Sequence, residues 1–76
     1  MQRQRVVAVT TASSRGSGYA VGPRLVLTSA HVTGPEGAAV QVFHPGRPKV
    51  YAGRVVWRGT PGGRDDAALV AITDAA

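Results

Sequence analysis

Turn-forming residues interrupt this chain so often that little room is left for a long helix. Ten glycines and five prolines are spread along 76 residues, and the stretches between them draw on twelve valines. Valine is stiff about χ1 and packs well on a pleated sheet, whereas glycine and proline mark turns and end helices. The sequence therefore predicts an all-β chain built from short strands.

Six segments have the composition or the alternation that is typical of strands, and they recur about every ten residues. They are 5–11, 17–21, 25–28, 39–43, 50–58 and 67–72. The turn residues between them favour antiparallel neighbours, and 29–32 has room for one helical turn. A chain this short holds a single core. We expect residues 1–76 to form one small six-stranded antiparallel β-barrel.

Alternation within the segments predicts which side chains fill this barrel. We expect Gly53, inside the longest segment, to mark a bulge or a tight bend. The side chains expected to point inward are Leu25, Leu27, Val40, Val42, Val55, Leu69 and several of residues 6–9.

Composition narrows the classes of protein to which the chain can belong. It has no cysteine, which excludes a disulfide framework and a thiolate metal site. The basic start, Met1 to Arg5, is followed by an apolar run too short for a signal peptide, and no segment is long enough to span a membrane. We expect a cytoplasmic chain with no membrane partner.

The net charge of +5 raises the question of a nucleic-acid partner. Eight of the nine cationic residues are arginines, but they are scattered, and the four aromatic residues are spread over three segments. This spacing makes a poor stacking platform, so nucleic acid is not the expected partner. A non-catalytic basic barrel that binds protein or single-stranded nucleic acid remains the alternative hypothesis.

Two motifs carry a family resemblance. Residues 16–32 include Leu-Thr-Ser-Ala-His at 27–31 and resemble the segment that leads to the catalytic histidine of trypsin-like serine proteases. Residues 65–72, an aspartate pair that opens an apolar strand, are similar to the segment that carries the catalytic aspartate of that family. The two motifs occur in the family's order, with His31 and Asp66 at the matching positions.

The resemblance implies that the chain is the first of the two β-barrels of such a protease. His31 would then act as general base and acid in peptide-bond hydrolysis, and Asp66 would orient its ring. The family also implies that the backbone amides of Ala30 and His31 bind the Asp66 carboxylate. The resemblance implies a peptide or protein substrate and no cofactor. No metal site is expected, because His31 and His44 lie on separate turns.

The nucleophile of this family lies in a Gly-x-Ser-Gly-Gly loop of the second barrel, and that loop is absent. The serines of the chain are Ser13, Ser14, Ser17 and Ser29, and none has this context. We therefore expect a separate chain or a downstream segment to supply the serine and the oxyanion-binding amides. The 76-residue chain by itself is expected to be inactive.

Overall fold

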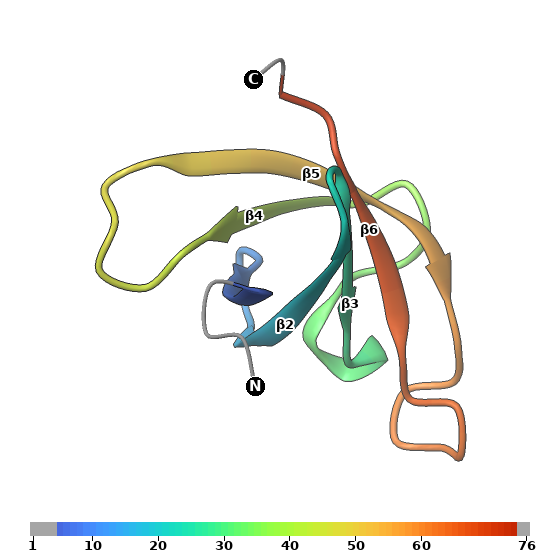
Figure 1. Cartoon of the computed structure of the whole chain (residues 1–76). Coiled ribbons are helices and arrows are strands. Elements are labelled where there is room, and N and C mark those ends of the chain that lie inside the picture. The colour runs from blue at the N-terminus through green and yellow to red at the C-terminus, as the bar shows by residue number, and fades with distance from the viewer. Residues whose placement is uncertain (1–4, 75–76) are drawn as a thin grey trace.

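The computed structural model describes residues 5–74, which form a closed barrel of six antiparallel strands (Figure 1). The all-β six-stranded prediction is confirmed, as is the single helical turn near residue 30. The elements are β1 (Val6–Thr10), β2 (Arg15–Gly22), β3 (Leu25–Thr28), the 3₁₀ turn η2 (Ala30–Val32), β4 (Ala39–Phe43), β5 (Val50–Arg58) and β6 (Ala68–Ile72). In residues 5–74 no helix has the length and apolar character that crossing a bilayer requires.

The order of strands around the barrel is β1, β2, β3, β6, β5, β4, and β4 pairs with β1 to close it. Strand β6 thus lies between β3 and β5, although it is the last strand in the sequence. The η2 turn follows β3, and the loop of residues 59–67 precedes β6. Because β3 and β6 are antiparallel neighbours, these two segments lie at the same end of the barrel (Figure 1).

Small side chains fill the interior. Val40, Val42 and Val55 are buried as expected, and Val7 and Val9 are the buried members of the 6–9 run. The expectation for the three leucines is wrong. Leu27 is 40% exposed and Leu25 and Leu69 are half-buried, because Val26, Ala68 and Val70 take the inward positions. Among residues 5–74 the buried apolar cluster consists of Val7, Val9, Val26, Val32, Val40, Val42, Val55, Ala68 and Val70.

Two inward-facing glycines explain why this interior takes valine. A Cβ at Gly18 would lie 2.8 Å from a Val26 methyl, and a Cβ at Gly53 would lie 2.8 Å from a Val70 methyl. Both distances are shorter than carbon atoms tolerate, so the missing side chains make space for the valines opposite. Gly53 pairs regularly with both neighbouring strands, and the irregularity of β5 falls between Val55 and Trp57. The expected bulge is therefore displaced from Gly53.

Candidate active site

The η2 turn presents His31 to solvent at one end of the barrel. Val32 N–H donates to the Ser29 carbonyl at 3.1 Å, and Thr33 N–H donates to the Ala30 carbonyl at 3.2 Å. Ala30 and Val32 are buried and fix the turn on the core, whereas the His31 side chain is 63% exposed. The turn thus holds the backbone of His31 firmly and leaves its ring accessible.

The loop before β6 places the second residue of the site. Asp65 organises this loop, since its side chain accepts the Thr60 N–H at 3.3 Å and its carbonyl accepts the Ala67 N–H at 2.7 Å. Gly62 has a φ of +74°, a left-handed conformation that favours glycine. Asp65 is therefore a turn former, and it leaves the next carboxylate, Asp66, free to point toward η2.

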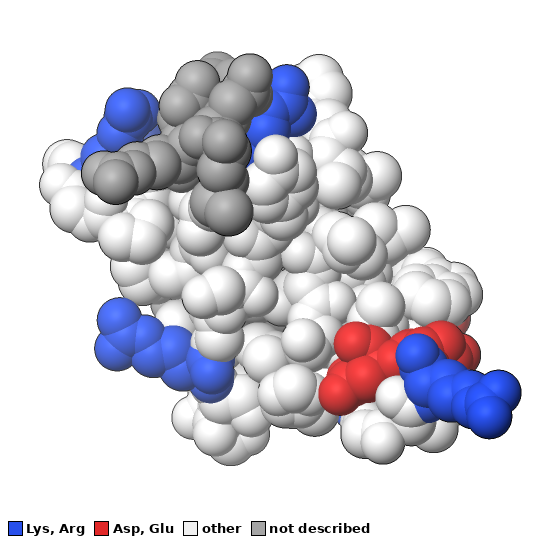
Figure 2. Space-filling view, turned by 60° about the horizontal axis from the view of Figure 1, so that its bottom comes forward, with Lys and Arg blue, Asp and Glu red and all other residues white. Residues whose placement is uncertain are grey.

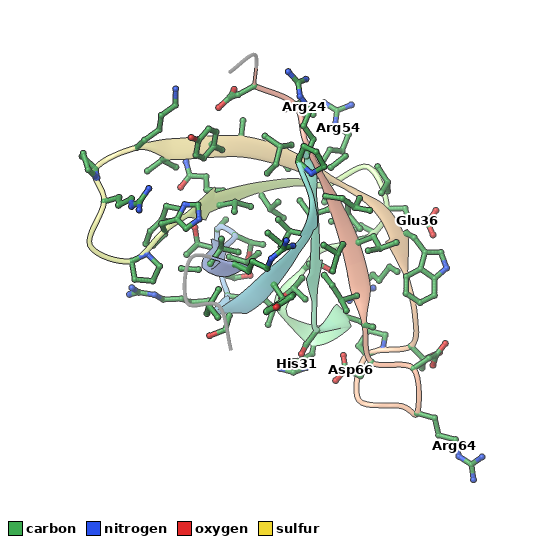
Figure 3. The ribbon with its side chains drawn as sticks, viewed as in Figure 1. Arg24, His31, Glu36, Arg54, Arg64 and Asp66 are labelled. Carbon is green, nitrogen blue, oxygen red and sulfur yellow. The ribbon has the colours of Figure 1, made fainter. Side chains whose placement is uncertain are left out.

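His31 engages both oxygens of the Asp66 carboxylate. Its backbone N–H donates to Oδ1 at 2.9 Å, and its ring Nδ1 lies 2.7 Å from Oδ2. Figure 3 shows the two side chains next to each other at the lower end of the barrel, with Arg64 pointing away from them. The Ala30 amide, which the resemblance also assigned to Asp66, makes no bond to it in the described part of the chain. The two predicted site residues are thus neighbours although 35 positions separate them.

The protonation states of the pair follow from these bonds. The hydrogen bond from the His31 ring is the main cause that lowers the pKa of Asp66; partial desolvation opposes it, while the backbone N–H groups of His31 and Gly62 add to it. Asp66 is therefore a carboxylate at neutral pH, and a carboxylate only accepts hydrogen bonds. It follows that Nδ1 of His31 carries a proton. In the neutral ring, Nε2 then has a free lone pair and can act as a base.

That basic nitrogen has no hydrogen-bond partner among residues 5–74. All four serines lie in this part of the chain, and none bonds to His31. Ser29 precedes the η2 turn, and the Ser14 amide takes part in a turn with the Thr11 hydroxyl. The chain thus holds an oriented base at its surface with no nucleophile in place beside it.

Four apolar side chains form a row on the outer surface of the barrel, one from each of β2, β3, β6 and β5. They are paired positions on successive strands, so they point to the same face. Tyr19 and Leu27 are each 40% exposed and Trp57 is 42% exposed. We call Tyr19, Leu27, Leu69 and Trp57 the outer row. Sequence alternation does not indicate this row, because it predicts that Leu27 and Leu69 point into the interior.

A shallow groove is shared by part of the outer row and by Asp66. Its lining includes Tyr19 and Leu27 of the row, Ser17 and Ser29, and Asp66. On the face of the molecule that carries this end of the barrel, the acidic side chains form one cluster beside a basic side chain, and most of the remaining described surface is uncharged (Figure 2). An apolar surface therefore adjoins the His31–Asp66 pair.

Other kinds of site find less support in the geometry. Within residues 5–74 no three His, Asp or Glu side chains gather as a metal-binding group. His44 follows β4 and lies at the opposite end of the barrel from His31. Tyr19 and Trp57 share the outer row, but Leu27 and Leu69 separate them. They do not form a continuous aromatic platform for bases.

No protein-family model, curated protein or solved structure matches the chain. What the site can do is therefore derived from its residues and their geometry.

Proposed function

We propose that this chain supplies the histidine and aspartate of a serine endopeptidase of the trypsin-like kind, as the first of two barrels. A second chain or segment would carry the serine. The observation that supports this proposal most strongly is that His31 binds both oxygens of Asp66, one through its backbone and one through its ring. This arrangement fixes the tautomer and the direction of an exposed imidazole, which a general base requires.

In the completed site, Nε2 of His31 accepts the proton of the serine hydroxyl as the serine oxygen attacks the peptide carbonyl. The resulting imidazolium is stabilised by the Asp66 carboxylate. It then gives the proton to the leaving amine, and the acyl group stays on serine until a water, deprotonated in the same way, releases it. The amides that stabilise the tetrahedral oxyanion come from the serine-bearing part.

The outer row supports the same proposal. A small barrel gains nothing in solution from exposing Tyr19, Leu27 and Trp57 side by side, and such patches mark surfaces that bind another protein. Because Tyr19 and Leu27 of the row share a groove with Asp66, a protein that packs on the row also lies close to the His31–Asp66 pair. We therefore assign the row to contact with the serine-bearing part.

The test joins the chain to a second barrel that carries a Gly-x-Ser-Gly-Gly segment, either as a mixture or as a fusion. The joined protein should hydrolyse peptides and react with a fluorophosphonate, whereas the 76-residue chain should do neither. His31→Ala should abolish hydrolysis, because it removes the base. Leu27→Asp should prevent association of the mixed chains. Gln41→Asp adds the same charge to β4, outside the row, and is its matched control.

Two results would reject this proposal. One is labelling of the isolated chain by the fluorophosphonate, since this would place a reactive serine within it. The other is a complete lack of hydrolysis in mixtures and fusions whose His31–Asp66 contact is intact by NMR. Salt-sensitive binding of single-stranded nucleic acid by the same samples would then favour the basic binding module.

A further inference from the structure

Arg58 connects the barrel wall to the turn that carries His31. It is the last residue of β5 and is half-buried. Its Nε donates to the Ala30 carbonyl at 3.3 Å, and its Nη2 donates to the Thr33 carbonyl at 3.3 Å. These two carbonyls bracket His31 in the sequence. One guanidinium therefore holds the turn on both sides of the histidine.

Besides the burial of Ala30 and Val32 and its own short-range hydrogen bonds, the η2 turn depends on bonds from its surroundings to keep its shape. It is three residues long, and Ser29 at its start makes no side-chain capping bond. Short 3₁₀ segments have poor hydrogen-bond geometry and depend on their surroundings. The Ala30 carbonyl also accepts the backbone N–H and the hydroxyl of Thr33, each at 3.2 Å, so Arg58 completes a cluster of bonds on one oxygen.

Arg58 also lies close to the other half of the site along the sheet. Its partner in β6 is Ala68, two residues after Asp66. The backbone of β5 at Arg58 thus fixes the start of β6, and the side chain of the same residue fixes the η2 turn. Asp66 and His31 are each connected to this one position on the barrel.

From these contacts we infer that Arg58 is a positioning residue for His31. It holds the η2 turn in the arrangement in which the His31 N–H and ring Nδ1 reach the two oxygens of Asp66. The inference rests on the proposed role of this pair in catalysis. Arg58 touches neither the Asp66 carboxylate nor the His31 ring among its hydrogen bonds, so it acts through the backbone of the turn.

Two carbonyls in fixed positions require the planar fork of arginine. The Nε–H and Nη2–H groups of a guanidinium point to different acceptors from one rigid plane, whereas lysine offers a single nitrogen on a flexible stem. Arg58→Lys keeps the charge and reaches at most one carbonyl well. Arg58→Met keeps most of the apolar stem and reaches neither.

The test reads His31 by NMR in the 76-residue chain, using its backbone amide and the ring nitrogen signals that distinguish the two tautomers. In the natural sequence, Asp66→Asn should shift both sets of signals. In Arg58→Met this response should fall by more than half, and Arg58→Lys should give an intermediate response. Arg54→Met is the matched control, since Arg54 is an exposed arginine of the same strand at the opposite end of the barrel (Figure 3). It should leave the response unchanged.

Far-UV circular dichroism shows which variants keep the barrel, and Arg58→Lys serves as the deciding variant if Arg58→Met unfolds. A full response to Asp66→Asn in a folded Arg58 variant would overturn the inference and leave the proposed function standing. If the His31 signals of the natural sequence did not respond to Asp66→Asn, the contact between His31 and Asp66 would be disproved. Both proposals would then be rejected. In the completed enzyme we expect Arg58→Met to lower kcat by about 10-fold to 100-fold with KM unchanged, because the base is displaced while the substrate contacts remain.

Discussion

The two carboxylates that flank strand β6 have different partners. Asp66 lies two residues before the strand and Asp74 two residues after it, so they are at opposite ends of the barrel. Asp74 accepts the Ala52 N–H at 2.7 Å, and the adjacent Thr73 N–H donates to the Ala52 carbonyl at 2.9 Å. Asp66 also accepts backbone N–H groups, but its second oxygen binds an imidazole ring.

This difference shows what separates a structural carboxylate from a candidate catalytic one. Asp74 is bound to a main-chain group that keeps its proton, so its hydrogen bond fixes residue 74, just after β6, against β5. Asp66 is bound to an imidazole ring, a group that can accept and donate a proton during a reaction, so the charge of Asp66 affects a reaction in which that ring takes part. Residue type and distance from the strand are the same for both, and the partner alone distinguishes them.

The largest expected effect is on hydrolysis by the completed enzyme. Asp66→Asn should lower kcat by roughly 10⁴-fold, as neutralising the acid of a triad does, because the amide no longer holds the Nδ1–H tautomer of His31. Asp74→Asn should change kcat less than 2-fold, since an amide oxygen still accepts the Ala52 N–H. Steady-state kinetics of the two variants, prepared in the same fusion, measures the contrast.

Equal losses in both variants would show that β6 needs both charges for folding and would break the comparison. Circular dichroism of each variant guards against this reading. A loss confined to Asp66→Asn in a folded protein would sharpen the comparison, because the two substitutions are chemically identical.

The six-stranded antiparallel fold could be predicted from the sequence, but the residues that fill the interior of the barrel could not. Turn residues gave the six strands and the antiparallel pairing. Strands β3 and β6, however, are apolar on both faces, so alternation does not say which face is buried. The larger leucines looked like better core residues, yet a narrow barrel with glycines opposite has room only for valine and alanine. The volume of the barrel interior decides which residues of β3 and β6 point inward, and the local sequence of a strand does not reveal that volume.

The site was partly predictable for a similar reason. His31 and Asp66 lie in motifs, so the resemblance found them, and the structure brings them into contact. Arg58 lies in no motif. Its acceptors are 25 and 28 residues away in the sequence, and the pairing of β6 with both β5 and β3 brings them within reach. Its place at the end of the predicted strand 50–58, directly before a turn rich in glycine and proline, is the one sequence signal that could have drawn attention to it.

The next largest effect concerns the loop that carries Asp66. A Cβ on Gly59 would collide with the Asp65 carbonyl, so Gly59→Ala must displace the loop. We expect the free energy of unfolding to fall by about 1–3 kcal/mol, as overpacking usually costs. At the Asp74 end, Gly46 has a φ of +84° and open space around it, so Gly46→Ala costs about 1 kcal/mol of backbone strain. Urea unfolding followed by circular dichroism measures both.

The part of the structure that each glycine substitution displaces is more informative than the loss in free energy of unfolding. Gly59→Ala should shift the His31 ring signals, because it moves Asp66, whereas Gly46→Ala should leave them in place. If both glycine variants moved the His31 signals equally, the two ends of the barrel would be coupled and the contrast between their carboxylates would lose its meaning.

The smallest effect is on the titration of Asp66 itself. Since the His31 ring is the main cause of its lowered pKa, a carboxyl ¹³C titration should place Asp66 below the ordinary aspartate value of about 3.9. His31→Ala should raise this pKa only part of the way back, because the N–H groups of residues 31 and 62 still bind the carboxylate. A folded pKa below the unfolded one means that the carboxylate stabilises the barrel above about pH 4 and loses this contribution as the pH falls through the folded value. The free energy of unfolding of the natural chain and of Asp66→Asn should therefore converge in acid. An Asp66 midpoint that is the same with and without the His31 ring would show that the backbone amides alone bind the carboxylate, which would make Asp66 a structural residue like Asp74.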